Sequence, residues 1–279
     1  MRVDESYLTD PYATWRLLRD EAPVEPIELP GGRRVWLVTR YEDVRAALAN
    51  PLLGKDSKRL AELSGRPVGE RSRIRSSGVL GEHMLNSDPP DHDRLRRLVS
   101  RAFTARRIEG LRPRIEQIAA GLLDAIDPGS EVDLLESFAF PLPVTVICEL
   151  LGMPEADRAD FRAWSHVLVS GGQVDTLRQA MDSVAEALTA LVAAKRADPG
   201  DDMLSDLVRA RDADDRLSEN ELTSMAFLLL VAGHETTANL IGNGVLALID
   251  NPDQQAALRA DRSLLPAAIE EMLRYQGPL

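Results

Sequence analysis

The longest uninterrupted apolar stretch of the chain runs from Met225 to Ala232. Ser218 and Glu221 precede it at the S-x-x-E spacing of a capping box, and the Asn-Pro pair at 251–252 follows it. This pattern predicts a helix over residues 219–250, roughly 45 Å long. Because its first half is apolar on every face, we expect that half to be buried in the core.

Polar residues return in the middle of this helix at His234, Glu235, Thr236, Thr237 and Asn239. Ala232, Glu235 and Thr236 share one side of the helix at i, i+3 and i+4. Burying a carboxylate or a hydroxyl is costly unless it has a partner, so the cluster favours a functional site. Two structural alternatives stay open: a Thr that only bonds the carbonyl one turn back, and a Gly233 that only permits close packing. A zinc-protease motif is excluded, because it needs His where Ala238 stands.

Helical patterns, bounded by proline and glycine, also cover most of the remaining chain. Only two short runs are typical of strands, 24–27 and 35–39, with a turn at 30–32 between them. Residues 54–80 and 210–216 are polar and predict loops. The fold class is therefore mainly α with a small N-terminal β element, and no linker divides residues 1–279 into separate domains. The other helices are expected at about 11–22, 41–49, 91–103, 111–126, 138–151, 155–170, 173–196, 201–210, 252–260 and 264–275.

Composition limits the partners of the chain. With 279 residues, a net charge of -12 and a pI of about 4.9, it does not favour nonspecific binding to nucleic acid or to an anionic membrane. The single cysteine, Cys148, excludes an internal disulfide and is most simply a small core residue. The first residues do not form a signal peptide, and no apolar run approaches the ~20 residues of a membrane span. We therefore expect a cytoplasmic protein without a membrane segment.

A second candidate site follows the Asp88-Pro89-Pro90 turn, which leads into a helix. His92 and Arg96 are four residues apart, so they share a face of that helix. Two potential cations on one face suit a bound carboxylate or phosphate. The alternative is an ordinary solvated basic face.

Three motifs stand in one order along the chain and are supported by shorter matches throughout. Together they resemble the cytochrome P450 family, in its soluble bacterial class, over essentially the whole sequence. The resemblance implies the P450 fold, a haem b cofactor bound through iron, and a haem-thiolate monooxygenase that inserts one oxygen atom of O₂ into a small organic substrate. A role in tailoring secondary metabolites is compatible with this class. The motifs are Asp88-Pro89-Pro90-x-His92-x-x-x-Arg96, Ala232-Gly233-x-Glu235-Thr236-Thr237 and Glu271-x-x-Arg274.

The resemblance also assigns roles to the cofactor-facing residues. It implies that His92 and Arg96 bind the haem propionates. Ala232 and Gly233 would let the long helix pass close over the haem and distort locally. Glu235 and Thr236 would be the acid–alcohol pair that delivers protons during oxygen activation.

The remaining implied roles concern substrate, structure and electron supply. Leu228, Val231 and Ala232 would line the substrate pocket, and Glu271 and Arg274 would form a structural ion pair behind the haem. Electrons would reach the enzyme from NAD(P)H through separate proteins of the ferredoxin and ferredoxin reductase type, because the chain contains no flavin or iron–sulfur motif.

The sequence departs from the family at its C-terminal end. The family's cysteine ligand lies in a glycine-rich loop beyond the Glu271-x-x-Arg274 helix, and no such loop occurs before Leu279. Cys148 lies in an apolar helix outside any such loop, so we expect no metal ligand within this chain. The chain is expected to be a single incomplete P450 domain over 1–279, about the N-terminal two-thirds of the enzyme. An inactive truncated remnant and a non-catalytic helical protein that binds a small ligand are the alternatives.

Overall fold

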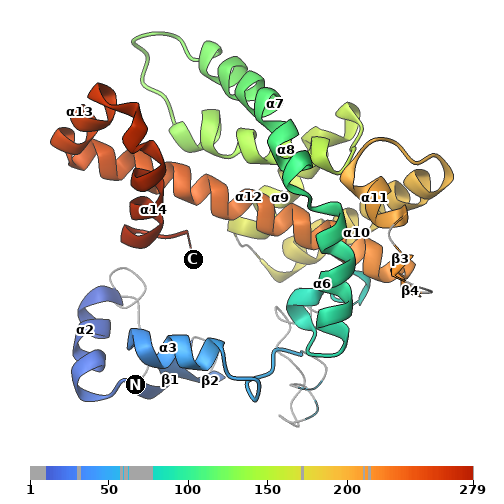
Figure 1. Cartoon of the computed structure of the whole chain (residues 1–279), viewed down its shortest axis with the longest axis horizontal. Helices are drawn as coiled ribbons and strands as arrows, with labels where there is room; N and C mark the ends of the chain where they lie inside the picture. The colour runs from blue at the N-terminus through green and yellow to red at the C-terminus, as the bar shows by residue number, and fades with distance from the viewer. Residues whose placement is uncertain are drawn as a thin grey trace. The chain divides into compact units, whose positions relative to one another are not determined.

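The computed structural model describes residues 11–29, 33–56, 59, 62, 78–170, 173–209, 211–212 and 215–278 (Figure 1). Close contacts divide the chain into two compact units, residues 1–55 and 56–279. We describe each unit by itself.

The first unit contains the strand pair predicted from the sequence. β1 (Val24–Leu29) and β2 (Arg33–Val38) are antiparallel, with Val24 opposite Val38 and Leu29 opposite Arg33. Two helices accompany them, α2 (Pro11–Glu21) and α3 (Tyr41–Leu48). All four elements agree with the sequence prediction to within a few residues, whereas the turn predicted at 30–32 lies outside the described residues.

The second unit is helical. Its short single turns are η1 (Gly78–Leu80), η2 (Met84–Asn86), the π-turn η3 (Leu135–Ala139), η4 (Glu155–Asp157) and η5 (Arg262–Leu264). Its helices are α6 (Asp91–Ala102), α7 (Ala105–Asp124), α8 (Pro141–Leu150), α9 (Arg158–Ser170), α10 (Val174–Ala197), α11 (Met203–Arg209), α12 (Glu219–Asp250), α13 (Pro252–Ala260) and α14 (Leu265–Tyr275).

Three predicted boundaries are wrong, each for a local reason. α7 begins six residues earlier than expected, because the Thr104 hydroxyl caps it by accepting a hydrogen bond from the Arg107 N–H at 3.3 Å. α8 begins at Pro141, a residue suited to the first helical position, after the π-turn η3. The predicted loop at 210–216 contains two antiparallel two-residue strands, β3 (Arg211–Asp212) and β4 (Asp215–Arg216).

α12 is the central helix of this unit, as the sequence predicts. Its capping box is complete: the Ser218 hydroxyl accepts from the Glu221 N–H at 3.1 Å, and the Glu221 carboxylate accepts from the Ser218 N–H at 2.8 Å. Residues 222–230 are all buried. In Figure 1 the helix spans the unit, and it packs against α8, α10, η1 and η3.

The expectation that no segment resembles a membrane span needs correction. By length and composition alone, α12 is long and apolar enough to cross a membrane. Of its most apolar 18-residue segment, 39% is buried inside the protein. Its polar residues are few, so the average over the whole helix is apolar. The helix nevertheless forms the core of the unit, and a core helix of a soluble protein passes the same test.

The N-terminus of α12 is tied to α6 by a charged contact. The Arg94 guanidinium donates to both carboxylate oxygens of Glu221. Burial alone would raise the pKa of Glu221, but hydrogen bonds from Arg94 and Ser218 and the charge of Arg94 hold that pKa below its ordinary value of 4.5. The Glu221 side chain therefore stabilises the folded state as a carboxylate.

We expect this contact to make folding stability fall with acid. A carboxyl group whose pKa is lowered by folding stabilises fully above its unfolded value, and its contribution is lost as the pH falls through the lowered pKa. Glu221→Gln should reduce the free energy of unfolding at neutral pH and flatten its decline below about pH 4.5. Urea titrations at several pH values measure this. Glu219→Gln, whose carboxylate is 60% exposed, is the control and should leave the decline in place.

Candidate functional site

The middle of α12 carries the polar face predicted from the helical spacing. Ala232 is exposed, whereas Glu235 and Thr236 are half-buried. The Thr236 hydroxyl donates to the Ala232 carbonyl at 2.9 Å, and the Thr237 hydroxyl donates to the Gly233 carbonyl at 3.2 Å. Both threonines thus make the bond to the carbonyl one turn back that the sequence left open as a structural role.

Glu235 differs from the two threonines. Among the residues that the structure describes, no group forms a hydrogen bond or an ion pair with its carboxylate. A half-buried carboxylate without a partner is costly unless it serves a purpose. Glu235 is thus a carboxylate in the middle of α12 whose oxygens are open to a ligand or a water molecule.

Gly233 packs against the neighbouring helix. A Cβ built at Gly233 would lie 3.3 Å from Cδ1 of Ile147 in α8, so the absence of a side chain allows this close approach. α12 is assigned as α-helix from Glu219 to Asp250. The contact with Ile147 fits the close-packing role that the sequence left open for this glycine.

The residues predicted to line a substrate pocket differ in exposure. Leu228 is 8% exposed and belongs to the hydrophobic core, and Val231 packs against the same core. Only Ala232 lies on open surface. None of these three side chains lines the pocket that contains Phe140 and His234 or the pocket that contains Leu248 and Tyr275.

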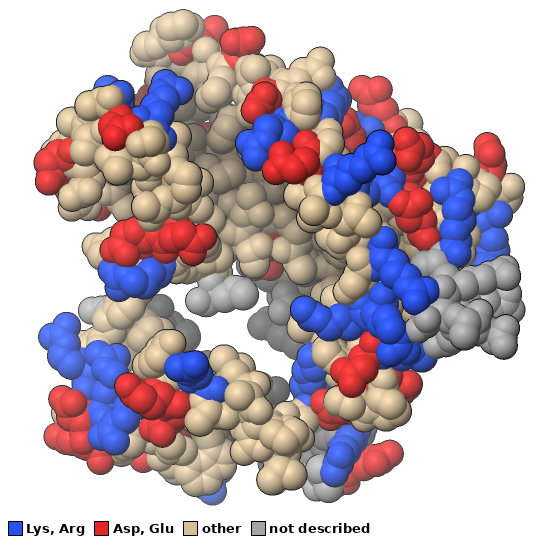
Figure 2. Space-filling model, viewed as in Figure 1, with Lys and Arg blue, Asp and Glu red and all other residues tan. Residues whose placement is uncertain are grey.

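The predicted anion site lies on α6. Arg96 is exposed, and within the described part of the chain its guanidinium has no hydrogen-bond or ion-pair partner. His92 is half-buried, and its Nδ1 lies 2.9 Å from Oδ1 of Asp93. The carboxylate of Asp93 therefore offsets any positive charge on His92, so Arg96 is the stronger anion-binding group. Figure 2 shows Lys and Arg side chains gathered over α6.

Glu271 and Arg274 form the predicted ion pair on α14. Their two contacts are bidentate, with Arg274 Nε donating to Oε2 of Glu271 at 2.7 Å and Nη2 donating to Oε1 at 2.6 Å. The hydrogen bond from Arg274 lowers the pKa of Glu271, and the same bond raises the pKa of Arg274. Both side chains are mostly exposed, so the pair orders the surface of α14 more than it stabilises the fold.

Cys148 is a core residue, as the sequence predicts. Its side chain is 0% exposed within the hydrophobic core, and burial raises the pKa of the thiol to about 11. The thiol is therefore protonated at neutral pH and enclosed. A thiol buried in apolar surroundings is less reactive than an exposed one.

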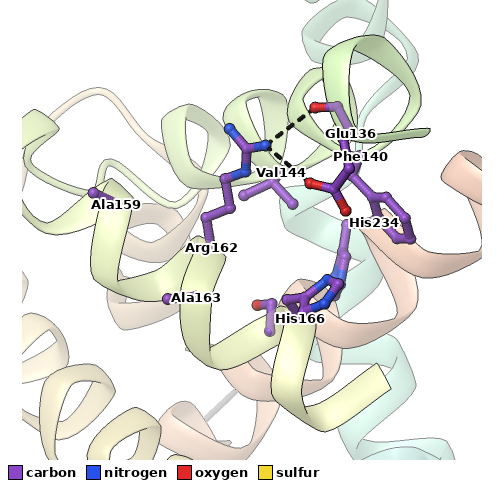
Figure 3. A pocket seen from close by; sticks show the side chains of 9 residues that line it. Glu136, Phe140, Val144, Ala159, Arg162, Ala163, His166 and His234 are labelled. Atoms are coloured by element: carbon purple, nitrogen blue, oxygen red, sulfur yellow. Dashed lines mark hydrogen bonds and ion pairs between the residues drawn. The ribbon is translucent and has the colours of Figure 1, made fainter. Parts of the chain in front are cut away.

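Sequence reasoning missed a pocket of about 350 Å³ on another side of α12 (Figure 3). His234 contributes from α12, Phe140 and Val144 from the start of α8 and the turn before it, and Ser165 and His166 from α9. The only signal in the sequence was the buried position of His234 beside the polar face. No periodicity links the three segments, which meet only in the fold.

Comparisons with known proteins identify the class. The profile of the family described as Cytochrome P450 matches residues 169–279. Cytochrome P450 107B1 from Saccharopolyspora erythraea is 54% identical over 100% of this chain and 69% of its own length. Cytochrome P450 monooxygenase PikC from Streptomyces venezuelae is 49% identical over 99% of this chain and 65% of its own length. The tirandamycin C-bound P450 monooxygenase TamI matches with a TM-score of 0.88 and 49% identity, over 98% of this chain and 69% of that one.

The chain belongs to the cytochrome P450 family. The high TM-score at nearly half-identical sequence shows that its mainly helical fold, with the small N-terminal sheet, is the P450 fold. The chain spans 65–69% of the length of these relatives.

Proposed function

We propose that this chain carries the distal, oxygen-activating side of a haem-thiolate monooxygenase that inserts one atom of O₂ into a small organic substrate. The observation that carries this proposal is the middle of α12. There Glu235, whose carboxylate has no partner among the described residues, stands beside the hydroxyl of Thr236 and the exposed Ala232, on the central helix of the core. A structural helix has little reason to hold these groups together.

The residues present fit a haem in two respects. The exposed Ala232 leaves room for a flat ring against the centre of α12, and the surface along this helix is mostly uncharged (Figure 2). On α6, the guanidinium of Arg96 has no partner among the described residues and matches a propionate carboxylate in geometry. Arg96 and His92 would hold the propionates, Ala232 would face the ring, and Gly233 beside it would let α12 pass close to the ring.

When bound, haem supplies the iron centre at which dioxygen is activated. The chain's own contribution is the supply of protons. Glu235 can take up a proton from solvent, and Thr236 can hold a proton donor next to the exposed Ala232 surface. The hydrogen bond from Thr236 to the Ala232 carbonyl fixes the hydroxyl in place. The Thr236 hydroxyl therefore has a structural role in the helix and can also hold the proton donor.

Relatives suggest the substrate class. The similar proteins include a vitamin D(3) 25-hydroxylase, a 6-deoxyerythronolide B hydroxylase and the tirandamycin C-bound TamI. By analogy, we propose that the substrate is a secondary metabolite bound near Leu228, Val231 and Ala232. Electrons would come from ferredoxin-type proteins, and the enzyme would act in the cytoplasm. The ion pair of Glu271 and Arg274 would lie behind the haem. Both compact units would belong to one domain.

Haem retention tests the assignment of the anion site. In the haem-loaded enzyme that contains this sequence, Arg96→Ala should lower haem occupancy, because a forked donor that pairs with a carboxylate is lost. Arg96→Lys should restore little of it, since a point charge does not reproduce the fork. Haem absorbance per protein after dialysis is the measurement.

Arg97→Ala is the matched control. Arg97 is also an exposed arginine of α6, but it lies five rather than four residues after His92, so it does not share that face. We expect its loss to leave haem occupancy near the unmodified level. Equal retention of haem by the two alanine variants would show that the propionates do not bind at Arg96.

A further inference from the structure

The pocket beside His234 lies on the opposite side of α12 from the proposed haem face. Residues two apart in a helix point about 200° apart, so His234 and Thr236 face nearly opposite directions. The pocket of about 350 Å³ falls within the size range of small-molecule sites. Any molecule that occupies it is therefore separated by the helix from the groups of the proposed reaction.

Two buried polar groups line this pocket. Ser165 is 2% exposed, and its hydroxyl has no hydrogen-bond partner among the described residues. His234 is 1% exposed, and its Nδ1 lies 2.7 Å from the Leu230 carbonyl. Because a carbonyl only accepts, Nδ1 carries the proton in this bond. In the neutral ring, Nε2 is then a bare acceptor, and no described group donates to it.

The rim of the pocket is charged but balanced. Arg162 reaches from α9 toward Glu136, as Figure 3 shows. Its Nη2 lies 3.2 Å from the Glu136 backbone oxygen and 3.8 Å from the Glu136 carboxylate. The cation therefore has its own counter-charge and gives no net attraction for an anionic ligand. Apolar side chains supply much of the remaining wall, among them Phe140, Val144 and Ala163.

We propose that this pocket binds a small neutral molecule that carries a hydroxyl group, a phenol or an alcohol. A hydroxyl can donate to Nε2 of His234 and accept from Ser165, whereas a ketone can only accept and a protonated amine can only donate. The apolar wall suits a small ring or alkyl chain. Occupation gives Nε2 of His234 a donor, and it gives the buried Ser165 hydroxyl a partner when that hydroxyl turns toward the pocket. This site is independent of haem and of the proposed reaction.

Calorimetric titration of the 279-residue chain with phenol and with toluene tests the proposal. The two probes have nearly the same shape, and only phenol carries the hydroxyl. We expect phenol to bind about a hundredfold more tightly, the effect of two net hydrogen bonds. Phenol, but not toluene, should also shift the Nε2 signal of His234 in nitrogen-resolved NMR spectra.

Variants locate the binding. Ser165→Ala should weaken phenol binding about tenfold and leave toluene binding unchanged. Thr189→Ala is the control, because its hydroxyl bonds the Ala185 carbonyl on the exposed side of α10. It should change neither affinity. Ala163→Phe should fill the pocket and abolish binding of both probes.

Three results would overturn the proposal. Equal affinities for phenol and toluene would show that the buried polar groups do not recognise a hydroxyl. Unchanged phenol binding in Ser165→Ala, or in Ala163→Phe, would place the bound phenol elsewhere. An absence of binding by either probe at millimolar concentration would leave water as the only occupant of the pocket.

Discussion

Gly152→Ala should cost about 3–5 kcal/mol of folding stability, the largest effect that we expect from a single methyl group in this chain. Gly152 ends the turn after α8 with a φ of +66°, which an L-residue adopts only with strain. A Cβ there would clash with Cγ of Asp202 and would lie 2.5 Å from Nζ of Lys195. The methyl group would therefore force apart a nearly buried ion pair, whose Nζ–Oδ2 distance is 2.7 Å.

The ion pair cannot move away freely, because Asp202 is held on several sides. Its Oδ1 accepts from the Ser205 N–H at 2.8 Å, and its Oδ2 accepts from the Ser205 hydroxyl at 3.0 Å. That hydroxyl in turn accepts from the Gly200 N–H at 2.9 Å. Displacing Asp202 would leave several buried polar groups unpaired, and removing one partner from a buried pair is strongly destabilising.

Urea unfolding followed by circular dichroism measures the effect, and Gly129→Ala is the control. Gly129 also has a positive φ, +84°, but no atom lies within 4 Å of a Cβ built there. Its substitution should cost only the backbone strain, about 1–2 kcal/mol. If the two variants lose the same stability, the contact between Gly152 and the ion pair does not matter and strain alone explains both.

Thr236→Ala should uncouple oxygen consumption from product formation in the haem-loaded enzyme that contains this sequence. The loss of one positioned proton-transfer group costs about 10²–10⁴-fold in the step that it serves. Haem binding and NAD(P)H consumption should continue, because the substitution removes no propionate contact. Oxygen should then leave mostly as hydrogen peroxide. Product, peroxide and NAD(P)H measured in one reaction give the coupling directly.

Thr237→Ala separates this role from a structural one. Thr237 makes the same type of bond, to the Gly233 carbonyl, but points about 100° further round the helix. Both variants lose one bond to the preceding turn, so a purely structural hydroxyl predicts similar, small losses of thermal stability and unchanged coupling in each. Only a proton-transfer role predicts a large coupling defect that is confined to Thr236.

The elements of this fold that sequence predicts well are those with local signals. The capping box of Ser218 and Glu221 and the proline at 252 set both ends of α12, and the apolar run between them predicted its burial. Spacing alone placed Glu235 and Thr236 on one face. The exposure of Ala232 could not be predicted in this way. An apolar residue at the end of an apolar run is expected to be buried, yet no described neighbour covers Ala232.

The features that sequence could not predict depend on segments that meet only in the fold. The contact of Gly152 with Lys195 and Asp202 depends on how α10 and α11 return to the turn after α8. The pocket beside His234 likewise forms where α8, α9 and α12 meet, and helical spacing carries no information about that meeting. At Gly233 the sequence left open a role in close packing, and the contact with Ile147 in the structure fits that role.

The position of the haem relative to α12 tests the account most directly. Methyl-resolved NMR spectra of the enzyme that contains this sequence, loaded with iron(III) porphyrin and with diamagnetic zinc porphyrin, report which side chains lie near the metal. We predict that iron broadens the methyl signals of Ala232 and Thr236 most and leaves those of Val144 and Ala163, across the helix, nearly unchanged. Strong broadening of Val144 and Ala163 with sharp signals from Ala232 and Thr236 would place the haem on the wrong side of α12 for Glu235 and Thr236 to act.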